Sequence, residues 1–294
     1  MRKLNILLFV LALTISLNPA PIFSQEIPPD IEVMQIKPGF YRFYVNDYVH
    51  MFALMGTDGI FLVDAGFSET VNQVKAKLNE LDGEDIKYIV YTHSDGDHTT
   101  GHGIIDDNTI VISHADCRKK LEDGDYYDNE KLPGITFEGS LTLNFNGEDI
   151  KIISIPGGHS TEDVIVYFEK TGVVCLGDMV ISDSFPFVRV QEGASIYKLI
   201  NNIETVLSTF PDGTRCFPSH GREYSKRDLR NYLSMLNATI KIVTKAVKTG
   251  KNSEEMIKED ILKDWKTWNN KKWEWINTDL WISTIHYELT NKEK

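Results

Sequence analysis

Hydrophobic and polar positions follow two periods along the chain, one typical of strands and one typical of helices. Runs rich in β-branched and aromatic residues predict early strands at 41–45, 50–54 and 59–63. Residues 69–81 place their apolar side chains at helical spacing, which predicts an amphipathic helix. The next predicted elements are strands at 86–91 and 109–113 and a helix near 115–121.

The second half of the chain repeats this alternation of strands and helices. Two β-hairpins are predicted at 141–155 and 164–176, and the first turns at Asn146-Gly147, a favoured hairpin pair. The remaining predicted elements are a helix at 196–210, a strand at 215–218 and helical structure almost throughout from Lys226. Two such groups of strands and helices predict an α/β fold in which two sheets carry helices on their outer faces.

The N-terminus has the pattern of a secretory signal peptide. Two basic residues precede an apolar run over 4–17, which is shorter than the roughly 20 residues that a membrane-spanning helix needs. A cut after Ser24 meets the small-residue rule only in part, because Ile22 is bulky. We expect residues 1–24 to be a signal peptide and the mature protein to be secreted or periplasmic. An uncleaved membrane anchor is the alternative.

Composition and charge narrow the class of partner. The 294 residues carry a net charge of -12, and loss of residues 1–24 removes two positive charges, which makes it -14. An acidic chain does not attract nucleic acid or an anionic membrane. We therefore expect a small-molecule substrate, no nucleic acid, and no membrane contact after signal cleavage. Three cysteines are too few for a disulfide scaffold, although Cys175 and Cys216 could pair.

The densest candidate chemistry directly follows the predicted strand at 86–91. Four potential metal ligands lie within six residues, and they are His93, Asp95, Asp97 and His98. Imidazole and carboxylate groups together suit zinc, iron or manganese. Alternate residues of an extended segment point to one side, so His93, Asp95 and Asp97 can converge, while His98 can face a neighbouring ion. The alternative is a solvated acidic loop.

Later segments repeat one arrangement, in which a potential ligand follows an apolar strand with glycine nearby. These ligands are His159, Asp178 and His220, and Asp64 follows an earlier strand in the same way. Each residue alone is weak evidence, because a histidine at a strand end often binds only its own loop. Their order along the chain is the informative feature.

With these residues in this order, the sequence over about 33–222 resembles the metallo-β-lactamase superfamily. The resemblance implies a four-layer αβ/βα sandwich over 25–225, with metals at one edge between the sheets. We expect residues 226–294 to form a helical C-terminal extension packed on this domain. The implied ligands are His93, Asp95 and His159 for one metal, Asp97, His98 and His220 for a second, and Asp178 as the bridge. Asp64 would orient a ligand by hydrogen bonding, or else be a plain turn residue.

Asp95 departs from this resemblance, because the family usually has a second histidine there. Two divalent ions are expected, zinc by family, with iron or manganese favoured by the harder carboxylate ligand. Three carboxylates and a bridging hydroxide would cancel the four charges of two dications, whereas a histidine at 95 would leave +1. Asp95 therefore predicts a weaker Lewis acid. Alternatively, only one ion binds, or none.

The implied function is a secreted metal-dependent hydrolase in which a metal-bound hydroxide attacks the substrate and Asp97 passes a proton to the leaving group. A Gly-Asp pair such as Gly177-Asp178 is usual in the superfamily's thioesterases, lactonases and phosphodiesterases, whereas its secreted β-lactamases usually have Cys or Ser. An ester, thioester or lactone substrate is therefore expected. The alternatives are a β-lactamase, an iron-dependent redox enzyme and a non-catalytic metal-binding protein.

Loops are expected to supply the substrate pocket. The candidate wall residues are Tyr126, Tyr127, Phe185 and Phe187, and their alternative role is packing against the body. All five tryptophans lie between Trp265 and Trp281. They either pack the last helices onto the body or form a homodimer interface.

Overall fold

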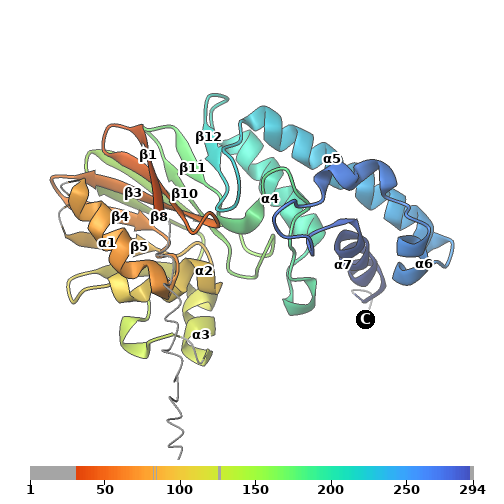
Figure 1. The fold of residues 1–294 in the computed structure, drawn as a ribbon, viewed down its shortest axis with the longest axis horizontal. Helices are drawn as coiled ribbons and strands as arrows, with labels where there is room; N and C mark the ends of the chain where they lie inside the picture. Colours follow the sequence, from red (N-terminus) through yellow and green to blue (C-terminus); the bar gives the residue numbers. More distant parts are fainter. Residues whose placement is uncertain (1–30, 82, 84, 125–126, 292–294) are drawn as a thin grey trace, which may run out of the picture.

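The computed structural model describes residues 31–81, 83, 85–124 and 127–291. The predicted signal peptide, residues 1–24, lies outside the described residues. Two β-sheets pack face to face, with α1–α3 on one side and α4–α7 on the other (Figure 1). The predicted α/β fold with a four-layer αβ/βα arrangement is therefore confirmed. None of the helices within the described ranges combines the length and apolarity needed to cross a membrane.

The first sheet contains seven strands in sequence order. They are β1 (Ile31–Lys37), β2 (Phe40–Val45), β3 (Val49–Gly56), β4 (Gly59–Val63), β5 (Ile86–Val90), β6 (Ile110–His114) and β7 (Ile135–Phe137). Neighbours from β1 to β4 pair antiparallel, and those from β4 to β7 pair parallel. The sequence prediction missed β1 and β7, because these edge strands leave most side chains exposed and lack a hydrophobic run.

The second sheet contains five strands in the order β12-β11-β10-β9-β8. They are β8 (Ser140–Phe145), β9 (Glu148–Ser154), β10 (Val164–Phe168), β11 (Val173–Cys175) and β12 (Arg215–Phe217). Asn146 and Gly147, with φ of 50° and 72°, turn the hairpin between β8 and β9, and this confirms the predicted turn. Cys175 and Cys216 lie on adjacent strands but are free, buried thiols.

Aromatic side chains fill the space between the two sheets. Phe40 of the first sheet meets Phe168 of the second with ring centroids 4.6 Å apart, and Phe52 meets Phe217 at 5.4 Å. All four are almost fully buried. Each such ring removes a large apolar area from water, so this layer holds the sheets together and brings their edges into line.

Helices cover both outer faces. The helices are α1 (Val71–Glu80), α2 (Gly96–Thr99), α3 (Ala115–Asp123), α4 (Ile196–Thr209), α5 (Lys226–Lys248), α6 (Ser253–Lys258) and α7 (Thr278–Asn291). The amphipathic α1 buries Val74 and Leu78 against the first sheet, which confirms the helix predicted at 69–81. Ser195 caps α4, and Ser225 forms a capping box with Asp228 at the start of α5.

The C-terminal helices share one hydrophobic core with the second sheet. Trp281 of α7 is buried, stacks on Phe185 with a centroid distance of 6.0 Å, and donates from Nε1 to Thr239 Oγ1 at 2.8 Å. Glu288 of α7 accepts hydrogen bonds from the Ser195 hydroxyl and from the backbone N–H of Ile196 at the start of α4. The division at 225/226 stays a prediction, because the helices beyond it belong to the same core.

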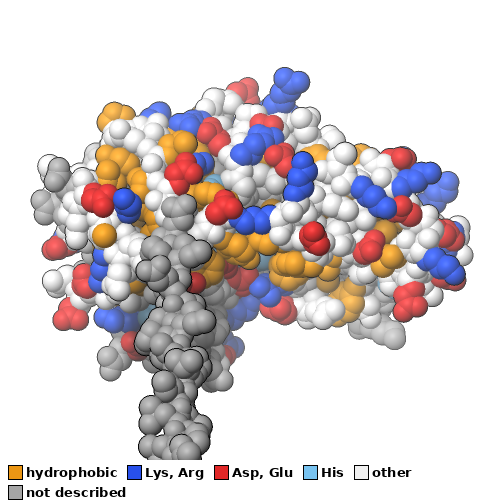
Figure 2. Space-filling view, in the orientation of Figure 1, with side chains coloured by type: hydrophobic (Ala, Val, Ile, Leu, Met, Phe, Trp, Pro, Cys, Tyr) orange, Lys and Arg blue, Asp and Glu red, His pale blue; other side chains and the backbone are white. Residues whose placement is uncertain are grey.

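Lys and Arg side chains lie interspersed with acidic ones over the face shown in Figure 2. Among the residues described on this face, no single basic patch gathers.

Replacing Trp281 tests how firmly the last helix is held. Trp281→Ala should lower the free energy of unfolding by about 3–5 kcal/mol, because it leaves a cavity and removes the hydrogen bond that Thr239 Oγ1 accepts. Trp275→Ala, in which the tryptophan is 53% exposed, is the matched control and should change it by less than about 1 kcal/mol. Denaturant unfolding measures both. Equal effects of the two variants would show that α7 is not part of the cooperative core.

Candidate metal centre

The candidate ligands all come from loops at one edge of the two sheets. His93, Asp95, Asp97 and His98 follow β5, and they precede or form the short helix α2. The other three follow strands of the second sheet, His159 after β9, Asp178 after β11 and His220 after β12. Residues far apart in the sequence therefore meet because the ends of these strands meet.

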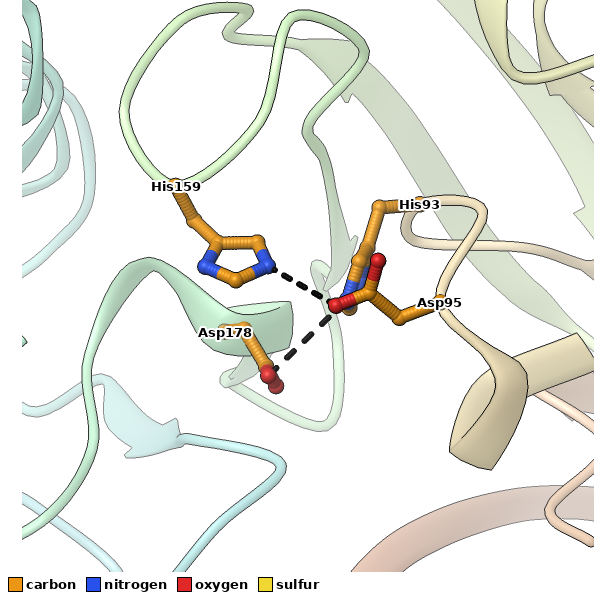
Figure 3. A group of neighbouring side chains, drawn as sticks. All are labelled: His93, Asp95, His159 and Asp178. Carbon is orange, nitrogen blue, oxygen red and sulfur yellow. Dashed lines mark hydrogen bonds and ion pairs between the residues drawn. The ribbon is translucent and has the colours of Figure 1, made fainter. Parts of the chain in front are cut away.

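Four of these side chains form a first group, His93, Asp95, His159 and Asp178, whose ligand atoms all lie within 4.8 Å of one another. Figure 3 shows them pointing toward one another from two loops and a short helical turn, which carries Asp178. Asp95 Oδ2 lies 3.3 Å from His159 Nε2 and 3.6 Å from His93 Nε2. His93 Nε2 lies 3.9 Å from Asp178 Oδ2.

A second group consists of Asp97, His98 and His220. Asp97 Oδ2 lies 3.3 Å from His98 Nε2 and 3.2 Å from His220 Nε2. Asp178 also contacts this group, with Oδ1 3.3 Å from His98 Nε2 and Oδ2 3.1 Å from His220 Nε2. Asp178 therefore lies between the two groups, and the structure brings together all seven ligands expected from the sequence.

Three buried polar atoms in this cluster lack a hydrogen-bond partner, namely His93 Nε2, His98 Nε2 and Asp178 Oδ1. Leaving such an atom unsatisfied costs about 1–3 kcal/mol. A cation in each group would satisfy these atoms. The donor set of imidazole nitrogens and carboxylate oxygens suits zinc, manganese or iron, so the residues present fit divalent metal ions.

In three of the histidines, the Nδ1 atom, which faces away from the cluster, makes a hydrogen bond. His159 Nδ1 donates to the Phe187 carbonyl at 2.8 Å, and His220 Nδ1 donates to the Tyr48 carbonyl at 2.9 Å. His98 Nδ1 donates to Asp64 Oδ2 at 2.8 Å. These bonds leave the Nε2 atom of each ring facing the cluster, which is the arrangement that orients a metal-binding histidine.

Asp64 is both a turn residue and a partner of a candidate ligand. Its φ of 64° places it in the left-handed region at the end of β4. Its buried carboxylate accepts from His98 Nδ1 and, at 2.8 Å, from the Thr92 backbone N–H. The two roles considered from the sequence therefore occur together, since the turn aims the carboxylate at His98.

The charges in the cluster shift the ionisation of its members. Burial would lower the pKa of His220, but Asp178 and Asp97 outweigh it and raise that pKa to about 10. Burial likewise opposes the effect of Asp95 and Asp178 on His159, whose pKa rises to about 9. For Asp95, burial alone would raise the pKa, but His93 and His159 hold it well below its usual range. The cluster thus keeps its carboxylates ionised and strongly favours positive charge.

A cavity of about 410 Å³ opens onto this cluster. Asp95, Asp97 and Asp178 lie in its wall, together with Phe187 and Arg189 of the segment after η4 (Gly177–Met179). Arg189 is not among the site residues predicted from the sequence. The signal that could have indicated it is a lone arginine close to two phenylalanines in a Pro-containing loop.

The C-terminal extension completes this cavity. Trp273 and Trp275, between η6 (Lys263–Trp268) and α7, lie in the cavity wall. Trp273 packs against Tyr48 and His220, with centroid distances of 4.8 Å to each, and Trp275 lies 5.1 Å from Phe187. From the sequence, these tryptophans are expected only to pack the last helices or to form a dimer interface. Their place in an Asn- and Lys-rich break between helices is the signal that could have indicated a loop site.

The expected pocket residues divide into different environments. Phe187 lines the cavity, whereas Phe185 is fully buried against Trp281 because it belongs to the C-terminal core. Tyr127 is also buried, and its hydroxyl bonds to Tyr91 and to the Lys131 carbonyl, so it closes the 122–134 loop instead of lining the cavity. Tyr126 lies outside the described residues.

The sequence over residues 45–240 matches the family model described as the metallo-beta-lactamase superfamily. The chain belongs to this superfamily. Its members are in general metallohydrolases, and this chain carries a candidate metal site. The matched range ends within α5, so the tryptophan segment and α7 lie beyond it.

Among relatives, the beta-lactamase-like protein 2 homolog of Caenorhabditis elegans is 25% identical over 175 residues, which cover 57% of this chain and 54% of that protein. The chain thus matches about half of that relative's length. A metallo-beta-lactamase from Pontibacter korlensis has a TM-score of 0.61 at 19% identity, covering 71% of this chain and 99% of that one. The DIM-1 metallo-beta-lactamase has a TM-score of 0.60 at 18% identity, covering 71% and 98%. These two structures share the fold of this superfamily member.

The position of Asp178 between the two groups predicts how much metal binding depends on it. Asp178→Asn should weaken metal binding by about tenfold or more, because it removes a charge that contacts His93, His98 and His220. Metal content per chain after dialysis, measured by mass spectrometry, reports the loss. Asp183→Asn is the control, since this carboxylate is exposed and pairs with Arg222. Unchanged metal content in Asp178→Asn would contradict the assignment.

Proposed function

We propose that the protein is a hydrolase with two divalent cations, acting on an ester, thioester or lactone of a small molecule. The observation that carries this proposal is the position of Asp178 between two histidine–carboxylate groups with unsatisfied buried atoms. Zinc is the metal proposed from the family, and Asp95 makes iron or manganese the alternative.

The chain's own residues would divide the work as follows. His93, Asp95 and His159 would hold one cation, Asp97, His98 and His220 the other, and Asp178 both. Two divalent cations held in this way would lower the pKa of a water molecule and polarise the carbonyl oxygen of the substrate. The hydrogen bonds of Asp64, Tyr48 and Phe187 keep the histidine rings aimed at the centre.

Asp97 is the residue we assign to proton transfer. Its carboxylate lies in the cavity wall and is held by His98 and His220. Burial would raise its pKa, but His98 and His220 keep that pKa below its usual range, so Asp97 is ionised. It would accept a proton from the water side and give it to the leaving group.

The cavity supports a small substrate with an apolar part. Its volume of about 410 Å³ lies within the range of small-molecule sites. Trp273, Trp275 and Phe187 give one side of it an aromatic surface. The preference for an ester, thioester or lactone over a β-lactam rests on the Gly177-Asp178 pair.

Secretion or a periplasmic location is proposed from residues 1–24 alone.

A homodimer through the C-terminal helices would have little exposed tryptophan surface to use. Trp281 is buried, and Trp265, Trp268 and Trp273 pack against the core of their own chain. Trp275 is the exposed tryptophan among them, and it lies at the cavity.

Hydrolysis can be tested with metal-loaded protein and a panel of p-nitrophenyl esters, acyl thioesters and lactones. We expect turnover of at least one class, and a loss of about 10²–10⁴-fold in kcat for Asp97→Asn. Asp212→Asn is the control, because this exposed carboxylate pairs with Arg230 and is not in the cavity wall. Hydrolysis of a chromogenic cephalosporin alone would favour a β-lactamase. Redox-active iron without hydrolysis would favour a redox enzyme. Bound metal without hydrolytic or redox activity would favour a non-catalytic metal-binding protein.

Trp275 should contribute to substrate binding and little to the chemical step. Trp275→Ala should raise KM by about tenfold while kcat changes less than about twofold, since the exposed ring offers contact area but no reacting group. Steady-state kinetics on the best substrate measures both. Tyr197→Ala, which removes an exposed aromatic ring outside the cavity wall, is the control. A fall in kcat with unchanged KM would contradict this role.

A further inference from the structure

Asp95 is paired with an arginine at the first ligand group. Arg189 Nη2 lies 2.5 Å from Asp95 Oδ2, the same oxygen that lies 3.3 Å from His159 Nε2. The two side chains are only 25% and 21% exposed, so solvent screens their charges weakly. Among the seven candidate ligands, the residue that departs from the family pattern thus has a cation beside it.

Arg189 is held in this position by the loop that carries His159. The backbone N–H of Arg189 donates to the His159 carbonyl at 3.0 Å, and His159 Nδ1 donates to the Phe187 carbonyl at 2.8 Å. The guanidinium lies 5.1 Å from the centre of the Phe187 ring. The arginine is therefore placed together with a candidate ligand and is not a mobile surface side chain.

A chain of ion pairs extends from Arg189 back to the residue beside Asp95. Arg189 Nη1 lies 3.2 Å from Glu192, which lies 3.9 Å from Lys120 Nζ, which in turn lies 2.9 Å from the buried Glu162. Glu162 accepts from the Ser94 hydroxyl at 2.7 Å. Glu192 is 53% exposed and shared with Lys120, so its charge is screened and the charge of Arg189 acts mainly on Asp95.

We propose that Arg189 is a positioning residue that cancels the charge of Asp95, so that the pair presents the metal centre with the net charge of a neutral histidine. Without Arg189, the charges of two dications, three carboxylates and a hydroxide sum to zero. Adding the charge of Arg189 brings the sum to +1, which is the value expected with a histidine at position 95. Arg189 pairs with two carboxylates, Asp95 at the site and the exposed Glu192. This inference rests on the proposed metal centre and concerns how its charge is set.

The test is to install the usual ligand and to measure zinc binding, without any substrate. Asp95→His supplies an imidazole but leaves Arg189 unmatched beside the site. We expect the zinc dissociation constant of the weaker site to rise by about tenfold or more, by Coulomb repulsion. The double variant Asp95→His with Arg189→Gln removes that repulsion, and its dissociation constant should return to within about threefold of the wild type. Competition with a chromophoric chelator measures each value.

A matched control uses an arginine elsewhere with two carboxylate partners. Arg222 pairs with Asp183 and Asp228 on the surface, so adding Arg222→Gln to Asp95→His should restore nothing. Zinc binding by Asp95→His as tight as that of the wild type would overturn the inference. So would a double variant without recovery. A wild type that binds no zinc, manganese or iron would instead overturn the proposed metal centre itself.

Single substitutions of Arg189 keep the inference falsifiable if Asp95→His does not fold. Arg189→Gln leaves the charge of Asp95 unmatched and should tighten zinc binding by about tenfold, whereas Arg189→Lys keeps the charge and should leave it within about threefold. Thermal unfolding checks that both variants are folded. Weaker or unchanged zinc binding in Arg189→Gln would show that Arg189 does not set the charge of this site.

Discussion

The convergence of three carboxylates and four imidazoles at one edge of two packed sheets is the constraint on which the rest of the structure depends. Such groups are costly to bury unless each finds an opposite charge or a hydrogen bond. The surrounding loops supply these partners through Asp64, the Tyr48 and Phe187 carbonyls and Arg189. The loops around the strand ends therefore supply the hydrogen bonds and ion pairs that this polar cluster requires.

The aromatic layer between the sheets stabilises the fold, and the charged edge beside it carries the candidate ligands. Burial of Phe40, Phe52, Phe168 and Phe217 stabilises the sandwich and sets how the sheet edges align. That alignment brings the loop after β5 against the loops of the second sheet, whose ligands could not otherwise meet those of the first. A rigid apolar scaffold thus holds polar groups at distances that they would not keep by themselves.

The C-terminal helices connect stability to the cavity. Trp281 and Glu288 fix α7 to the core and to the start of α4. The segment before α7 then places Trp273 and Trp275 against Tyr48, His220 and Phe187. Because the superfamily match ends within α5, Trp273 and Trp275 extend the cavity wall from outside the matched region.

The fold class and most strands and helices could be predicted from the sequence, because hydrophobic periodicity is a local property of the chain. Ligand spacing is local too, and it pointed to the candidate ligands His93, Asp95, Asp97, His98, His159, Asp178 and His220. It missed the edge strands β1 and β7, which carry little hydrophobic signal. It left Tyr127 and Phe185 as either pocket or packing residues, and the structure shows both of them buried. Arg189 beside Asp95 and Trp273 beside His220 are contacts between distant segments. These contacts became visible only in the folded structure, because they depend on how the sheets and the last helices pack and neither segment alone specifies its partner.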